Sequence, residues 1–481
     1  MSGGADRAQR ALDERARTAA ATLVAALRIQ APTALMIRGA DLGRALEQQL
    51  FFRLRADDPP MAGNRLLAEA ESLVRIAGTA AAGLGSIARR APAPGSVVAL
   101  VRQGVHLESL ALIEPELRGI GGPALHAIRI GPAARQNRVA GTPRAPTLFE
   151  VVDPRLIPPL AAHHIAVRGI SGSAAVSASV AAFARRELDR IAAGAIGVES
   201  VVRRYRPSLL VSFDEIGTWA RILPAVARRW GVPTLDLPHA EAADPVAIEG
   251  AGYDTFAVYG PQAREVLDRA GIPAHRVHEI GAPRFDPLIA TARELPAPTT
   301  RDSVLFAGQY VTGRLTADAL AATYRAALAA AAATGSPLIV VPHPAQPEGT
   351  VERLMHTNPA PAGVRATVAT TGLHAALAES WLVITGWSNS VMEAAIAGVP
   401  SIAVTPGGVD APVAFAADGL AVAATDERSA AAAATELRMP ANAQEAVARA
   451  RASLTRRLGP LDGGASARAA ALIRSLATAP R

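Results

Sequence analysis

The chain has 481 residues, which is long enough for more than one hydrophobic core. Half of its residues are hydrophobic and 19% are charged, a balance typical of a globular protein rather than a disordered one. All 49 basic residues are arginine, because the sequence contains no lysine. A Walker-type phosphate loop, a Schiff-base lysine and a pyridoxal site are therefore excluded, since each needs an amine.

The chain also lacks cysteine, which excludes a disulfide framework, a thiolate nucleophile and cysteine-ligated zinc. Its histidines show no metal-ligand spacing such as H-E-x-x-H, so we expect no metal and no cofactor. The net charge of +7 is compatible with peripheral contact at an anionic membrane surface or with an anionic acceptor. The 4% aromatic content and the lack of a concentrated basic patch argue against nucleic acid as a partner.

The first 94 residues predict a helical extension. Helical patterns cover Arg10 to Gln30, Asp41 to Arg55 and Asn64 to Ala81, and proline or glycine separates them. The N-terminus has no apolar signal-peptide core, and no run of about 18 apolar residues follows. We therefore expect a cytoplasmic protein, with the inner face of the membrane as its place of peripheral contact, and an extension that docks on the enzyme or on a partner.

A first α/β domain is predicted over residues 95–289. Ser96 to Val101 has the pattern of a buried strand, and Arg102 and His106 follow it in a strand-to-helix loop. Such loops line the ligand crevice of parallel α/β sheets. The alternative for His106 is that its side chain only packs or caps.

Acidic residues follow the next predicted strand of this domain, Ser208 to Phe213. Asp214 and Glu215 stand directly after it, and His239 follows the strand after that. Carboxylates and imidazole at strand ends are candidates for proton transfer. Alternatively, Asp214 is a helix N-cap with Glu215 in the first turn, and His239 is an ordinary loop histidine.

A second α/β domain is predicted over residues 302–440, after an extended linker between Ala290 and Asp302. Its first strand, Ser303 to Ala307, is followed by Gly308 and Gln309, and glycine there suits a close approach of the backbone to a ligand. Another strand pattern ends in His343-Pro344, which adds a proton or hydrogen-bond donor at the same edge.

The turn after Val383-Ile384 gathers hydroxyl and amide groups. Ser388, Asn389 and Ser390 lead into a helix that contains Glu393. Free backbone N–H groups and hydroxyls at a helix start favour phosphate binding. The same residues also fit a capping box, with Ser390 as N-cap and Glu393 at N3.

The ordered pair of motifs, HP followed by TGWSNSVME, resembles the nucleotide-binding domain of GT-B glycosyltransferases, most of all the bacterial capsule, polysialyl, Kdo and teichoic-acid (CDP-glycerol glycerophosphotransferase-like) group. Members of that group use CMP- or CDP-activated donors. The resemblance implies that His343, Pro344, Ser388 and Ser390 contact the nucleotide and its phosphate, and that Glu393 holds the ribose. The expected donor-binding residues are Gly308, Gln309, His343, Pro344, Ser388, Asn389, Ser390 and Glu393.

We therefore predict an α/β protein with two Rossmann-like domains facing a cleft, an N-terminal helical extension, and C-terminal helices (residues 441–481) that pack back on the first domain. The resemblance implies a metal-independent transferase that moves a sugar or polyol phosphate to a cell-surface glycan. Asp214 is the first candidate base, followed by Glu215 and His239, and His343 would stabilise the leaving phosphate. Arg102 and His106 would contact the acceptor. Two alternatives stay open, a non-hydrolysing UDP-GlcNAc 2-epimerase and a catalytically silent glycan-binding or scaffolding protein.

Overall fold

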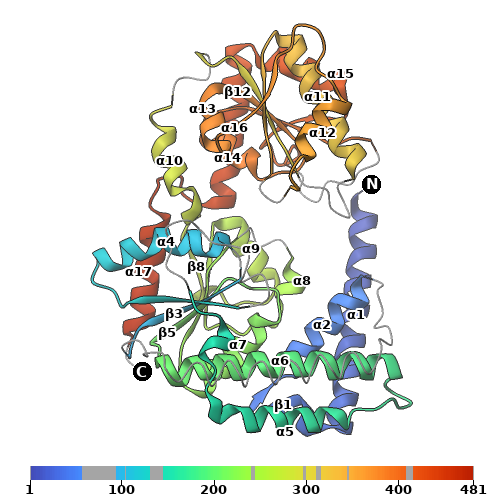
Figure 1. The fold of residues 1–481 in the computed structure, drawn as a ribbon, viewed down its shortest axis with the longest axis vertical. Coiled ribbons are helices and arrows are strands. Elements are labelled where there is room, and N and C mark those ends of the chain that lie inside the picture. The colour runs from blue at the N-terminus through green and yellow to red at the C-terminus, as the bar shows by residue number, and fades with distance from the viewer. Residues whose placement is uncertain are drawn as a thin grey trace. The chain divides into compact units, whose positions relative to one another are not determined.

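The computed structural model describes residues 2–56, 94–102, 104–130, 145–239, 244–295, 300–309, 316–343, 346–407 and 415–479. Pro344 and the predicted helix over residues 64–81 lie outside these ranges. The chain forms two compact units, the first made of Met1–Ile280 with Ser466–Arg481 and the second of Gly281–Ala465. Figure 1 shows the elements of each unit.

The first unit contains a six-stranded parallel sheet (Figure 1). The strands lie in the spatial order β4 (Leu125–Arg129), β3 (Val97–Val101), β5 (Leu209–Ser212), β6 (Thr234–Asp236), β7 (Thr255–Val258) and β8 (Val277–Glu279). After β4 the chain crosses back over β3 to form β5, so the strand order reverses at β3 and β5. Their short apolar sequences are those of strands covered on both faces.

Successive residues of a strand point to opposite faces, and here both faces are packed with helices. Val98 and Leu210 face a core that includes α5 (Ile157–Arg168), α6 (Ala178–Tyr205), α7 (Trp219–Arg229) and α9 (Pro261–Arg269). Val97 and Val211 face the other core, with α4 (Gly104–Gly119) and α17 (Ala465–Thr478). The last helix of the chain thus covers the sheet of the first unit.

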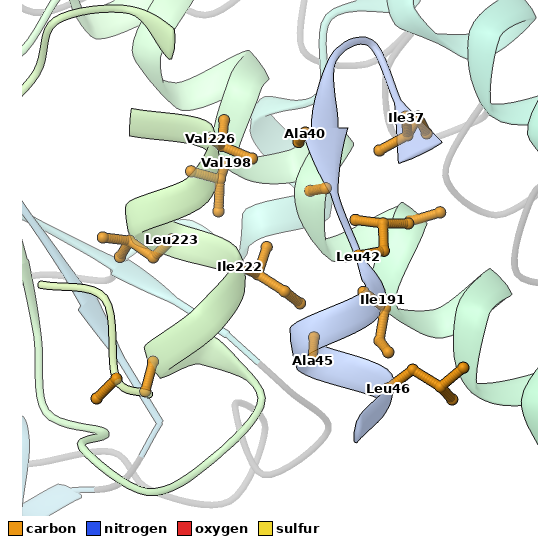
Figure 2. Close-up of a cluster of buried hydrophobic side chains, with 14 of the residues drawn as sticks. Ile37, Ala40, Leu42, Ala45, Leu46, Ile191, Val198, Ile222, Leu223 and Val226 are labelled. Carbon is orange, nitrogen blue, oxygen red and sulfur yellow. The ribbon is translucent and has the colours of Figure 1, made fainter. Parts of the chain in front are cut away.

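The N-terminal helices pack on the first unit. A two-stranded antiparallel hairpin, β1 (Met36–Ile37) and β2 (Ala40–Asp41), lies between α1 (Ser2–Gln30) and α2 (Gly43–Arg55). Figure 2 shows Ala45 and Leu46 of α2 close to Ile191 of α6 and Ile222 of α7. All four side chains are buried. Since burying one large apolar side chain contributes about 2 kcal/mol, this contact fixes α2 on the unit.

The second unit contains another six-stranded parallel sheet, in the order β11 (Ala366–Val368), β10 (Leu338–Val341), β9 (Ser303–Ala307), β12 (Ser380–Thr385), β13 (Ser401–Val404) and β14 (Val422–Ala424). The order reverses at β9 and β12, as in a dinucleotide-binding sheet. One core contains α11 (Ala317–Thr334), α12 (Thr350–Thr357) and α15 (Glu427–Leu437), and the other contains α13 (Leu373–Glu379) and α14 (Ser390–Ile396).

Two further helices of the second unit are α10 (Asp286–Ala292) and α16 (Pro440–Leu458), which both contact α14. The prediction of two Rossmann-like α/β domains is confirmed by the two sheets. Within the described part of the chain, no helix has the length and apolar character needed to cross a membrane.

Candidate functional site

In the first unit, four predicted site residues follow the two strands at which the strand order reverses, and His239 follows the neighbouring strand β6. Arg102 and His106 come after β3, and Asp214 and Glu215 come after β5. Arg102 Nη1 donates a hydrogen bond to Asp214 Oδ2 at 3.1 Å, which joins the two loops. Ligands of open α/β sheets bind outside the carboxyl ends of the strands at such a reversal.

His106 is buried beneath this cluster, with only 2% of its surface exposed. Its ring stacks on Phe213, with centroids 4.6 Å apart, and its centroid lies 5.0 Å from that of His239. The Arg102 N–H donates to Nδ1 at 3.2 Å, so the proton of the neutral ring is on Nε2. Burial, with smaller effects of His239 and Arg102, lowers the pKa of His106 to about 3. The structure gives His106 a packing role, and its contact with an acceptor stays a prediction.

Asp214 organises the loop after β5. Its Oδ1 accepts a hydrogen bond from Gly217 N–H at 2.6 Å, while Arg102 binds its Oδ2. Its own N–H donates to Asp236 at 3.1 Å, and the hydroxyl of Tyr253 donates to its carbonyl at 3.1 Å. A Cβ atom at position 217 would collide with the Asp214 carboxylate and displace it from these hydrogen bonds. Both carboxylate oxygens of Asp214 are therefore engaged.

Glu215 and His239 form a second pair at this edge. Glu215 Oε2 lies 4.0 Å from His239 Nδ1, and the two side chains are 12% and 26% exposed. Burial, and next the charge of Asp214, raises the pKa of Glu215 to about 7. The capping alternative for the two acids is wrong, because α7 begins at Trp219 and its N-cap is Thr218.

Two members of the cluster were missed by sequence reasoning. Asp236 ends β6 and is 3% exposed, and Tyr253 is fully buried. Burial, with the charges of Glu215 and Asp214, raises the pKa of Asp236 well above its ordinary value. A signal was present for Asp236, since it is the only acid in the apolar strand pattern Thr234 to Leu237. A buried acid next to a predicted acidic pair is typical of a functional site.

In the second unit, one side chain ties together the strands at the reversal. Gln309 follows β9, and its Oε1 accepts hydrogen bonds from the N–H groups of Gly386 at 3.1 Å and Trp387 at 3.2 Å. The hydroxyl of Thr385, at the end of β12, donates to the carbonyl of Ala307 at 2.9 Å. The residues predicted from separate motifs after β9 and β12 are thus brought together.

The turn into α14 does not form the predicted capping box. Its N-cap is Asn389, which makes no side-chain capping bond, and Glu393 Oε1 lies 3.4 Å from His374 Nε2 of α13. Ser388 Oγ accepts a hydrogen bond from Ser390 N–H at 3.3 Å, while Ser390 Oγ is buried without a partner among the described residues. The capping-box alternative is wrong for this turn, which leaves its polar groups for another role.

His343 and Gly308 lie beside each other at the ends of β10 and β9. The His343 N–H donates to Gln346 Oε1 at 3.2 Å, and burial lowers the pKa of its ring. Gly308 N–H donates to the carbonyl of Val341 at 2.9 Å, and a Cβ atom at Gly308 would lie 2.9 Å from the same oxygen. Packing on β10 thus already requires glycine at 308 and engages its amide.

Over the described ranges, we find no group of three or more histidine, aspartate or glutamate side chains arranged to hold a metal ion.

No protein-family model and no curated protein matches the sequence. Solved structures do match. UDP-GlcNAc 2-epimerase from Neisseria meningitidis, bound to UDP-GlcNAc, is 10% identical over 77% of this chain and 97% of that chain, with a TM-score of 0.51. A putative UDP-N-acetylglucosamine 2-epimerase from Listeria monocytogenes is 14% identical over 80% of this chain and 96% of that chain, with a TM-score of 0.52.

The wall teichoic acid polymerase TagF matches with 13% identity over 79% of this chain and 88% of that chain, at a TM-score of 0.46. The epimerase matches show that this chain has the GT-B fold, as the sequence predicted. At such low identity they show the fold alone, so membership of the capsule and teichoic-acid group stays a prediction.

Proposed function

We propose that this protein is a GT-B enzyme that transfers a sugar or polyol phosphate from a nucleotide-activated donor, CMP- or CDP-linked, to a cell-surface glycan or its precursor. One observation carries the proposal. In each unit, most of the polar residues singled out by the sequence follow the two strands at which the strand order reverses, and His239 and His343 follow the strands beside them, β6 and β10. That position is the ligand-binding edge of open α/β sheets.

Glu215 and His239 are the best candidates for removing the proton from the acceptor hydroxyl. A general base must reach its proton and titrate near the working pH, and the pKa of Glu215 is raised to about 7. His239 is the more exposed of the two, and its Nδ1 faces Glu215. Asp214 uses both carboxylate oxygens to hold the loop. We therefore assign it to supporting the pair rather than to taking the proton.

The turn after β12 is the candidate phosphate site. The backbone N–H groups of Ser388 and Asn389 donate to no other described residue, so they are free to bind phosphate oxygens. Gln309 holds the preceding amides of Gly386 and Trp387 and so fixes the turn. Preorganised donors of this kind stabilise a departing phosphate. His343, at the end of β10, is the further donor for the leaving group.

A second candidate function is epimerisation of a UDP-sugar. Three matched structures with a TM-score of at least 0.50 carry the name UDP-GlcNAc 2-epimerase, one of them as putative. In such a reaction the C–H bond beside the anomeric carbon breaks, its electron pair expels the nucleotide, and both bonds form again with the proton on the other face. Glu215, with a pKa of about 7, has a suitable basicity for taking up and returning that proton. Unlike transfer, this reaction needs no acceptor.

The test is thermal stabilisation by CMP, CDP, UDP, GDP and ADP, because a ligand that binds only the folded state raises its melting temperature. Ser388→Ala removes the hydroxyl that is predicted to contact the phosphate and should weaken the shift. Thr435→Ala, which removes an exposed hydroxyl of α15 in the same unit, should not. Stabilisation by cytidine nucleotides supports the transferase. Conversion of UDP-GlcNAc without an acceptor, followed by NMR, supports the epimerase. Binding of a nucleotide without turnover of any donor supports a silent binding protein, and no binding by any nucleotide contradicts both enzymes.

A further inference from the structure

The side chain of Gln48, on α2, bridges the two segments that carry the proton-handling pair. Its Nε2 donates to the carbonyl of Ile216 at 3.2 Å and to the carbonyl of Ala247 at 3.1 Å. Ile216 directly follows Glu215. Ala247 lies in α8 (Pro245–Ile248), the first helix after His239. Gln48 is 7% exposed, so water does not compete easily for these hydrogen bonds.

Arg221 of α7 reinforces the same bridge. Its Nη1 donates to the carbonyl of Gly217 at 3.2 Å, and its Nη2 donates to the carbonyls of Ala247 at 2.9 Å and Glu249 at 2.7 Å. Burial lowers the pKa of Arg221 only to about 10, so the guanidinium is charged at neutral pH. The loop after β5 and α8 are thus held together by a charged donor from inside the α/β domain and by a neutral donor from the extension.

Other side chains of α2 contact the same two segments. Gln49 Nε2 donates to the hydroxyl of Thr218 at 2.7 Å, and Arg55 pairs with Asp244 just before α8. Figure 2 shows that α2 also packs its apolar residues on α7, so its position is set by the core. The apolar face of α2 therefore fixes the helix on α7, and its polar side chains contact the loop after β5 and the region of α8.

Gln48 and Arg221 also line a common cavity beside these segments. This cavity of about 60 Å³ is lined by Gln48 and Arg221 together with Arg17, Arg44, Glu47 and other residues. Ala20, Phe51 and Val246 also line this cavity, whereas the side chain of Ile216 is exposed. Arg221 spans the same two segments, but among the described residues it is Gln48 that donates to the carbonyl of Ile216 itself.

We propose that Gln48 is a positioning residue through which the N-terminal helices set the separation of Glu215 and His239. This inference rests on the proposed function of that pair. According to this inference, the N-terminal helices hold the catalytic residues in position, although no residue of these helices belongs to the site. Loss of the bridge should leave nucleotide binding unchanged, because the predicted nucleotide-binding residues belong to the second unit.

The test compares Gln48→Met with Gln30→Met in the full chain. Methionine keeps the length of the side chain and removes the amide donors. Gln30, which is exposed, is the control for the loss of such a link, because its Nε2 also joins the N-terminal helices to a distant segment, at Ser171, without touching the site loops. We expect Gln48→Met to speed amide exchange at Gly217 about tenfold and to lower kcat about tenfold, with unchanged UDP or CDP affinity and a shifted pH profile. Gln30→Met should change neither the amide exchange at Gly217 nor kcat.

Gln48→Asn provides a second variant, because it keeps an amide that is too short to reach both carbonyls. It should reproduce the kcat loss, whereas a general folding defect would also weaken nucleotide binding. Unchanged exchange at Gly217, or faster exchange with an unchanged kcat, overturns the inference. Failure of the proposed function has a different signature, since the wild-type protein would then neither bind nor turn over any nucleotide-activated donor.

Discussion

The ring of His106 lies nearly parallel to the ring of Phe213, with an angle of 17° between their planes. Phe213 directly precedes Asp214, so the stack fixes the start of the loop that carries both acids. Because the Nδ1 of His106 also accepts the Arg102 N–H, this one ring connects the ends of β3 and β5. A neutral ring is required for that hydrogen bond, which makes His106 sensitive to acid.

We expect His106 to stay neutral in the folded protein down to about pH 4, since its pKa is lowered to about 3. In the unfolded chain a histidine takes up its proton near pH 6.5, so the free energy of unfolding should fall as the pH falls from 6.5 toward 3. His106→Gln should reduce this dependence by up to one proton, or about 1.4 kcal/mol per pH unit. Urea unfolding at several pH values measures it, with exposed His356→Gln as the control. An unchanged slope would contradict the expectation.

Glu215→Gln should stabilise the protein at high pH while it abolishes turnover. The pKa of Glu215 is raised to about 7 in the folded protein. The folded protein therefore keeps a proton up to about pH 7 that the unfolded chain releases near pH 4.5. The free energy of unfolding therefore decreases as the pH rises from about 4.5 to about 7, and glutamine removes this loss, which is about 3 kcal/mol at pH 8. Activity should fall at least about 100-fold. At pH 4 both side chains are neutral, so an equal stability difference at pH 4 and pH 8 would argue against this origin.

Replacing His239 should mainly lower activity, whereas replacing Asp214 should mainly lower stability. His239→Gln should lower kcat about 100-fold or more and change stability by less than about 1 kcal/mol, because the side chain is partly exposed. Asp214→Asn should lower stability by about 2 kcal/mol, since it weakens the bonds to Arg102 and Gly217. Steady-state kinetics and urea unfolding of the two variants measure both effects. Full activity of His239→Gln would exclude the assigned role.

The sequence predicted strands and their ends well, because a buried parallel strand is a short apolar run with polar residues after it. The strand predicted at Ser303 to Ala307 has the same bounds in the structure. The prediction was wrong where one side chain could bind either its own helix or a residue of another helix. Ser390 and Glu393 have capping-box spacing, yet the carboxylate of Glu393 lies near His374 of another helix.

Contacts between distant segments were beyond the reach of sequence patterns. Gln48 and Ile216 are 168 positions apart, and nothing in a helical pattern indicates which carbonyl a glutamine will bind. The link from Gln309 to Gly386 is similar, since it depends on β9 and β12 being neighbours in the sheet. Parallel sheets pair strands that are distant in the chain, so such links appear only with the fold.

Gln309 offers a test of the turn after β12 that separates structure from ligand binding. Gln309→Leu removes the acceptor of two backbone N–H groups, of which that of Gly386 is buried, and should destabilise the protein by about 2 to 4 kcal/mol. Gln309→Glu keeps an oxygen acceptor for both amides and should destabilise it less. The new negative charge should nevertheless repel a phosphate at the turn and weaken nucleotide binding at least tenfold. Calorimetric titration with UDP and CDP measures the affinity, with Thr435→Ala as the control in the same unit. If Gln309→Glu binds nucleotide as tightly as the wild type, the phosphate does not bind beside Gly386 and Trp387.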